Sequence, residues 1–161
     1  MAAEGLRMRG FYRLQITDPD GSIAGDSGWH ENQIVNLGVN DYLCQLLGDM
    51  AGSHQITHAA LGTGTAPGAA ATGLDGELDQ TSSRAAVTAA TSSTSMKVQF
   101  TATFASVSSF VSDTMTLSNI GLFYLSDVTA GTLFAGNTYA TSTCATNQAV
   151  NVTYDIDFST A

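Results

Sequence analysis

Charged residues are scarce in this sequence, and basic residues are the scarcest of them. Only 12% of the 161 residues are charged, and 5 Lys and Arg stand against 14 Asp and Glu, which gives a formal net charge of −9. So few cations neutralise few phosphates, which excludes nucleic acid and anionic membrane surfaces as expected partners. Serine, threonine and alanine take the place of the missing charges. Hydroxyl and β-branched residues fit a pleated sheet, so the composition favours strands and packed interfaces.

Long apolar runs and closely spaced cysteines are also missing. The sequence has no stretch of about 18 apolar residues, and its N-terminus lacks the apolar core of a signal peptide, so no membrane span and no export signal are expected. Cys44 and Cys144 have no CxxC spacing, which argues against a zinc site and against a disulfide-stapled fold. We expect two buried free thiols, with a disulfide between them as the alternative.

Alternation of apolar and polar residues predicts strands along most of the chain. Every second residue is apolar in residues 12–16, 96–104 and 150–158, the period of a half-buried strand. The sequence DPDGS at residues 18–22 is typical of a type I turn and predicts a hairpin. About seven short strands joined by turns predict a mainly β fold, an antiparallel β-sandwich or jelly-roll-like domain over residues 11–161. Residues 1–10 are expected to form an N-terminal arm.

One segment, residues 38–51, has the spacing of a helix. Val39, Tyr42, Leu43 and Leu46 recur three and four residues apart, as the residues of one helical face do. Its polar side carries aspartates rather than lysines, so a membrane-binding helix is not expected. We therefore expect one α-helix packed against the sheet.

The glycine-rich stretch HAALGTGTAPG, residues 58–68, looks like a phosphate-binding loop, but its surroundings exclude one. A Walker-type loop needs Lys and then Ser or Thr at a fixed spacing, and none follow Gly62 or Gly64. Pro67 stands where a dinucleotide-binding fingerprint needs its third small residue. We interpret the glycines as turn-forming residues at the start of a long loop.

Acidic residues alternate at the end of that loop, at Asp75, Glu77 and Asp79, close to Arg84. An ion pair with Arg84, a weak cation site and a solvated acidic loop are the open alternatives, of which the solvated loop is favoured.

No arrangement of catalytic or metal-binding residues is recognisable. His54 and His58 are four residues apart, like the two histidines of a zinc-protease motif, but the glutamate of that motif is missing. Asp155 and Asp157 share one strand face, and we interpret them as solvated surface residues rather than a glycosidase pair. Neither a GxSxG motif nor a serine–histidine–carboxylate set is apparent. We therefore expect no enzyme activity, no catalytic residue, no cofactor and no metal.

Several segments follow one another in a recognisable order: NLGVNDYLCQLL, ITHAALGTGTAPGAAATGLDGEL with a later Arg, VQFTATF, LSNIGLFYL, and LFAGNTYA with VNVTYDIDF. This order resembles a broad group of small virion proteins of tailed bacteriophages. The resemblance covers residues 29–158 and is carried by the set of motifs rather than by any one of them. It implies a structural component of the virion.

Members of that group look like capsid decoration (cement) proteins or like tail-fibre and tail-tip components, and we expect a decoration protein. Such a protein binds the major capsid protein on the outer surface of the head, as a symmetric homo-oligomer that we expect to be a trimer, after synthesis in the host cytoplasm. The alternative is a tail-fibre, collar or baseplate component involved in host attachment, although the chain lacks a fibre repeat and a coiled coil. A receptor-binding module that contacts glycans through Trp29 is a further competing class. The candidate interface residues are Arg7, Arg9, Arg13, Asp75, Glu77, Asp79 and Arg84.

Overall fold

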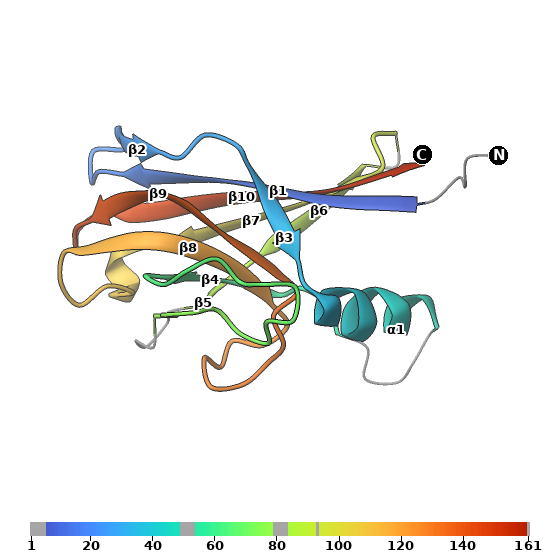
Figure 1. Ribbon diagram of the computed structural model, residues 1–161. Coiled ribbons are helices and arrows are strands. Elements are labelled where there is room, and N and C mark those ends of the chain that lie inside the picture. The colour runs from blue at the N-terminus through green and yellow to red at the C-terminus, as the bar shows by residue number, and fades with distance from the viewer. Residues whose placement is uncertain (1–5, 49–53, 79–83, 93, 161) are drawn as a thin grey trace.

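The chain forms one antiparallel sheet that is nearly closed into a barrel, with a helix at one end (Figure 1). The computed structural model describes residues 6–48, 54–78, 84–92 and 94–160. Its strands are β1 (Leu6–Thr17), β2 (Ile23–Asp26), β3 (His30–Ile34), β4 (His58–Gly62), β5 (Arg84–Ala86), β6 (Thr88–Ser92), β7 (Lys97–Phe104), β8 (Met115–Phe123), β9 (Ala135–Cys144) and β10 (Ala149–Thr160).

The order of the strands brings the two edges of the sheet together. The order is β5-β4-β8-β9-β3-β1-β10-β7-β6, and β2 pairs with β1. The first and last strands pair along their whole lengths, from Leu6 opposite Thr160 to Thr17 opposite Ala149. The edge strands β5 and β6 are separated in the sequence by Val87 alone, and β5 packs against β7. The sheet therefore closes on itself at β5, whereas β6 pairs only with β7 among the described strands.

Alternate side chains of the strands fill the interior of the barrel, as the period of two requires. Full burial of one large apolar side chain contributes about 1.5–3 kcal/mol, so this interior supplies the main stabilisation of the fold. The largest fully buried side chains are Tyr12, Tyr154, Phe104, Phe110, Phe123, Leu61, Leu117, Ile120, Leu122, Leu133, Val35 and Val150.

The expected mainly β fold is confirmed, whereas a β-sandwich or jelly roll is not. Those folds place two sheets face to face, but every strand described here belongs to one continuous sheet. Alternation along a strand predicts which side chains are buried. It does not predict that β3 pairs with both β1 and β9, and this double pairing joins the strands into a single curved sheet.

Residues 6–10 of the expected N-terminal arm belong to β1. Their backbone pairs with residues 156–160 of β10. The arm was predicted from the basic residues Arg7 and Arg9, but Met8 between them continues the inward-facing set of the strand. Residues 6–10 of the expected arm are therefore strand residues of the sheet, and residues 1–5 lie outside the described residues.

The helical backbone begins at residue 36, two residues before the expected start at 38, and the helix is not a regular α-helix. Gly38–Cys44 (η1) is π-helical and is followed by α1 (Gln45–Leu47), while residues 49–51 of the expected helix lie outside the described residues. A π-helix joins residues five apart, so side chains spaced for an α-helical stripe do not all stay on one face. Val39 and Leu46 are accordingly 37% and 54% exposed.

The two cysteines are free, and only Cys144 is buried, so the expectation of two buried thiols is wrong for the exposed Cys44. Burial raises the pKa of the Cys144 thiol to about 11. We expect a thiol reagent at mildly alkaline pH to modify Cys44 in the folded protein and Cys144 only after unfolding, because the thiolate is the reactive form. Mass spectrometry of the labelled chain checks this. Labelling of folded Cys44→Ser would contradict it.

Candidate functional site

Arg84, at the start of β5, organises the loop that carries the glycine and acidic motifs. Its side chain is 2% exposed. Nε and Nη2 donate to the two carboxylate oxygens of Glu77 at 2.6 and 3.1 Å, and Nη1 donates to the carbonyl oxygens of Leu125 and Ala130 at 2.9 Å each. The guanidinium carbon lies 3.7 Å from the centre of the Phe123 ring. Arg84 therefore joins three segments of this chain and is not a surface residue available to a partner.

Asp75 fixes the other end of the same loop. Its carboxylate accepts hydrogen bonds from the backbone N–H and the hydroxyl of Thr65, both at 2.8 Å. These bonds, the backbone bond first, lower the pKa of the Asp75 carboxyl below its ordinary value. Asn119 of β8 donates to the carbonyl oxygens of Thr65 and Asp75 at 3.2 and 2.7 Å. The loop is thus folded back and bonded to its own chain.

Glycine is required where this loop closes. A Cβ atom on Gly64 would lie 2.6 Å from Cγ of Asp75, and Gly76 has a φ of +59°. The interpretation of the glycines as turn-forming residues is consistent with this geometry. The amides of the turn bond within the loop, as Thr63 N–H does to the Gly76 carbonyl at 3.0 Å.

Among the alternatives for the acidic cluster, the structure contains the ion pair between Glu77 and Arg84. The Glu77 side chain is only 12% exposed, so the favoured solvated loop is wrong for this residue. Asp75 is exposed, and Asp79 lies outside the described residues.

The three N-terminal arginines project from β1. Arg9 pairs with Glu31 at 2.9 Å, with both side chains more than half exposed. Arg13 pairs with Asp26 of β2. Arg7 is exposed and forms no ion pair with another residue of the described part. An exposed pair such as that of Arg9 with Glu31 contributes about 0–1 kcal/mol, so it leaves Arg9 available to other partners.

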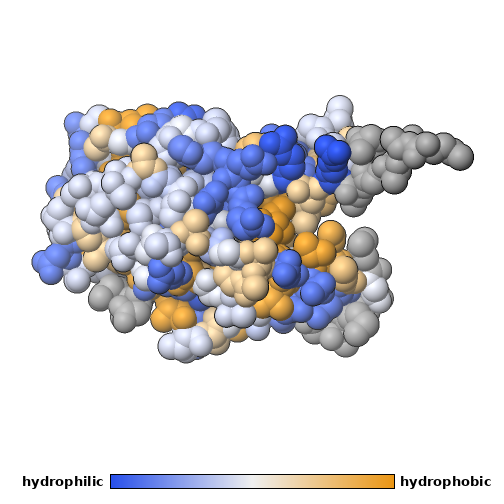
Figure 2. All heavy atoms as spheres, viewed as in Figure 1, coloured by the Kyte–Doolittle hydropathy of each residue, from blue (hydrophilic) through white to orange (hydrophobic). Residues whose placement is uncertain are grey.

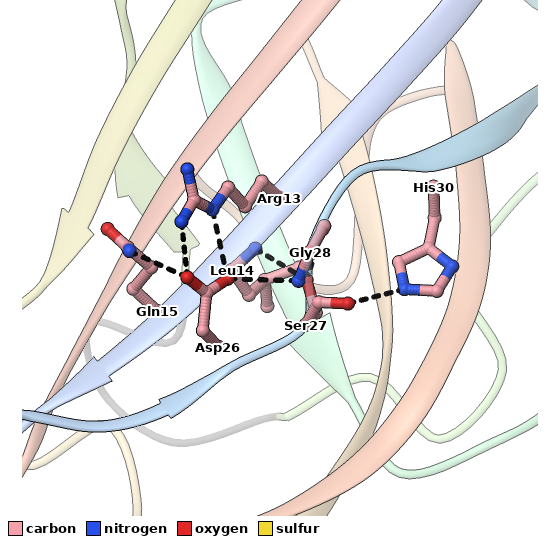
Figure 3. Close-up of polar contacts among 7 residues, drawn as sticks. All are labelled: Arg13, Leu14, Gln15, Asp26, Ser27, Gly28 and His30. Carbon is pink, nitrogen blue, oxygen red and sulfur yellow. Dashed lines mark hydrogen bonds and ion pairs between the residues drawn. The ribbon is translucent and has the colours of Figure 1, made fainter.

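Figure 3 shows the polar network around Asp26, where the chain passes from β2 to β3. Arg13 Nε and the Gly28 backbone N–H both donate to Oδ1 at 2.9 Å, while Arg13 Nη2 and Gln15 Nε2 donate to Oδ2, the latter at 3.0 Å. Ser27 accepts a backbone N–H from β1 and a ring N–H from the first residue of β3. The network anchors this corner to β1.

The donors around Asp26 predict how stability depends on pH. They hold the pKa of its carboxyl well below the ordinary value, Arg13 contributing most, followed by the Gly28 N–H and then Gln15. A carboxyl with a lower pKa in the folded state stabilises the fold above its unfolded pKa, about 4, and loses that contribution as the pH falls. We expect the free energy of unfolding to fall below pH about 4 in the wild type, and less steeply in Asp26→Asn. Urea unfolding across acidic pH measures this, and equal slopes would contradict it.

Asp155 and Asp157 were interpreted as solvated, which is wrong for Asp155. The Asp155 side chain is 7% exposed and accepts hydrogen bonds from Lys97 Nζ at 2.8 Å and Gln99 Nε2 at 2.9 Å. The cause is the register of β7 and β10, which sets Gln99 opposite Asp155 and Lys97 opposite Asp157. Lys97 and Gln99 therefore both donate to the Asp155 carboxylate. Asp155 and Asp157 are part of an ion-pair network on the outer face of the barrel.

The two histidines of the HQITH sequence have separate environments. The His54 ring stacks on Tyr124 with ring centres 3.6 Å apart and planes 6° apart. His58 Nδ1 lies 2.8 Å from the Thr57 hydroxyl. Within the described part of the chain, no group of three or more His, Cys, Asp or Glu is arranged to hold a metal ion.

An uncharged groove of about 360 Å³ lies between the helix, β6 and the ends of β1, β7 and β10. Figure 2 shows hydrophobic residues gathered beside the notch between the helix and the projecting strand ends. The strand ends contribute Met8, Val98, Ile156 and Phe158, and the helix contributes Leu43 and Leu46. None of the residues that line the groove is Asp, Glu, Lys or Arg.

The groove was not among the predicted sites, although two signals for it are present in the sequence. The row of inward-facing apolar side chains on β1 and β10 continues beyond the barrel to Met8 and Phe158. The helix also carries more apolar residues than one face can bury. What the sequence lacks is any indication that these surplus residues lie together. Their proximity depends on the pairing of β1 with β10 and on the placement of the helix.

Comparisons with known proteins give no family for the chain. No family model matches it, and neither the curated proteins nor the solved structures contain a significant match. In the part of the chain that the structure describes, no helix is long and apolar enough to cross a membrane.

Proposed function

We propose that the protein is a non-enzymatic structural protein of a bacteriophage virion. As a capsid decoration (cement) protein, it binds the outer surface of the head as a homotrimer and bridges neighbouring subunits of the major capsid protein. The order of sequence motifs between residues 29 and 158 supports the virion role. The structural observation that carries the proposal is the uncharged, apolar groove of about 360 Å³ at one end of the barrel.

The groove supports a role in protein binding because the polar residues of the motif-bearing loop are already engaged. Arg84 and Glu77 are paired inside the chain, and Asp75 bonds to Thr65. A contiguous apolar surface rimmed by polar residues is typical of a protein interaction site. A specific interface buries about 800 Å² on each partner. A decoration protein that spans two capsid subunits adds such area, which must be exposed again before the subunits separate.

A tail-fibre, collar or baseplate component involved in host attachment is the second candidate. Trp29 is 49% exposed. Exposed indole rings suit contact with a sugar or a protein, because the ring is apolar and carries one N–H donor.

The position and copy number of the protein in purified virions distinguish the two candidates. We expect it on the head, in a number comparable with that of the major capsid protein, as measured by quantitative mass spectrometry and antibody labelling in the electron microscope. A few copies confined to the tail would overturn the decoration role.

A capsid-retention assay tests the contribution of the groove to this role. Leu46→Ser removes an apolar side chain that lines the groove, whereas Val39→Ser changes an exposed helical residue outside its lining. We expect the first variant to be lost from capsids at a lower temperature than the second. Equal retention of both would remove the groove from the contact.

A further inference from the structure

The two edges of the sheet come together along only part of their length, which leaves an opening in the wall of the barrel. On one side of the opening stands β6, which pairs with β7 and with no other strand of the described part. On the other side runs the segment 54–56 that leads into β4, and it forms none of the backbone hydrogen bonds found outside the helices and strands of the described chain. The groove lies between these two walls, since Ala89, Thr91, Gln55 and Ile56 all line it.

The free edge of β6 lacks the features that block strand addition. Proteins protect edge strands with charged residues, proline, bulges or a covering segment. β6 has the sequence TAATS, it pairs with β7 without a register shift, and residues 88–91 are all exposed. Its outward N–H and C=O groups form no backbone hydrogen bond with another segment of the described residues, so they can pair with another backbone.

The groove beside that edge is suited to the side chains of an added strand. Ala89 and Thr91 face the groove, and Ala90 lies on the opposite face of β6. A strand placed next to β6 would direct every second side chain the same way, over Val98, Phe158 and Leu46. Because Ala89 and Thr91 are small, the volume of the groove is left for the side chains of the added strand.

We propose that an extended segment of a partner protein adds to β6 as a strand and completes the barrel. The segment has apolar residues at every second position, which fill the groove, and its other residues are neutral or basic. The neutral or basic character of these other residues follows from charge complementarity, because the groove is uncharged and the chain has a formal net charge of −9. Strand addition of this kind obtains affinity from main-chain hydrogen bonds and specificity from alternate side chains.

A second copy of this chain is the less suitable occupant. Antiparallel pairing of β6 with another β6 offers only Ala89 and Thr91 as inward side chains, which are too small to fill a volume of about 360 Å³. This inference rests on the proposed function and specifies the kind of contact that the protein makes. The edge of β6 would accept a strand even if the protein were not a virion component.

A peptide of known strand register provides the probe. The sequence KVQFTATF, residues 97–104, already pairs with β6 on its other edge and alternates in the required way. We expect a fluorescein-labelled peptide of this sequence, blocked at both ends, to bind the full chain saturably in an anisotropy titration. Ala89→Glu, which places a carboxylate in the groove, should weaken binding about tenfold or more, as loss of an interface hot spot does. The matched variant Ala90→Glu should leave binding within about twofold.

Two versions of the peptide, N-methylated on alternate residues, test the backbone contact. In a strand, successive N–H groups point to opposite edges, so only one of the two versions should retain binding. Equal binding by both versions, or no binding up to about 1 mM, would overturn the proposal. Sedimentation of the protein alone supplies the remaining test. A dimer lost in Ala89→Glu but kept in Ala90→Glu would identify a second copy as the occupant and also overturn it. The virion assay is independent, so the failure of one proposal does not entail failure of the other.

Discussion

Replacing Arg84 with methionine is expected to lower the free energy of unfolding by about 3–5 kcal/mol. The substitution keeps an unbranched stem over the Phe123 ring but removes the charge that pairs with Glu77. Glu77 is then left as a carboxylate of 12% exposure without its counter-ion, which is the costly outcome of breaking a buried pair. The carbonyl oxygens of Leu125 and Ala130 lose their donor as well. Urea unfolding followed by fluorescence measures the change.

Two variants separate the buried pair from a general effect of removing arginine. Arg9→Met breaks an ion pair whose partners are 56% and 61% exposed, so it should cost at most about 1 kcal/mol. The double variant Arg84→Met with Glu77→Gln should be less destabilised than the sum of the single changes, because the uncompensated carboxylate is gone. Equal losses for Arg84→Met and Arg9→Met would contradict the role given to Arg84.

Replacing Gly64 with alanine is expected to destabilise the fold by about 1–3 kcal/mol, the range of an overpacked site. The new Cβ would lie 2.6 Å from Cγ of Asp75 and against the backbone of that residue, so the loop must move away from β4. This movement also strains the bonds from Asn119 to the loop. Thermal unfolding of the purified variant is the measurement.

Gly68→Ala is the matched control for this prediction. It changes a glycine of the same loop, but no atom lies within 4 Å of the added Cβ and the backbone needs no positive φ. Alanine there should leave stability unchanged or raise it by about 0.4–1 kcal/mol, because it restricts the unfolded chain. A loss at position 68 as large as the loss at position 64 would show that the close approach to Asp75 is not the cause.

Local patterns in the sequence predicted several elements of the fold, but about seven strands were expected where the described residues form ten, and β3 was not predicted. Alternation at residues 150–158 predicts β10 and the direction of its buried face, and the DPDGS turn predicts the hairpin from β1 to β2. These predictions succeed because strand period and turn chemistry depend on neighbouring residues.

Contacts between distant parts of the chain were not predictable in the same way. The ion pair of Glu77 with Arg84 was only one of three alternatives, since its formation depends on where the loop folds back onto β4. The exposure of Leu46 was not predicted either, because the spacing that indicates a helix does not distinguish α- from π-type hydrogen bonding. The groove depends both on contacts between distant segments and on the hydrogen-bonding type of the helix.

The candidate interface residues show the same difference between local patterns, which were predictable, and contacts between distant segments, which were not. Arg13 lies on the polar face of β1, as alternation predicts, whereas Arg9 was expected in the arm. The pairing of Arg9 with Glu31 and of Arg13 with Asp26 follows from the neighbouring strands. Arg84 was selected as a candidate interface residue because it follows the acidic residues of the loop. Its burial required carbonyl oxygens from residues 125 and 130, which no local pattern associates with it.

The ladder between β1 and β10 affects how fast the chain folds. All twelve residues of β1 pair with residues of β10, which lie far from them in the sequence. Contacts of such large sequence separation slow folding, because the closure entropy of nearly the whole chain is lost before the pairing is gained. Until then β1 can pair with β2 and β3 on one edge, while the edge that pairs with β10 stays open. An open strand edge associates wrongly with other chains, so the yield of folded protein depends on how long this edge persists.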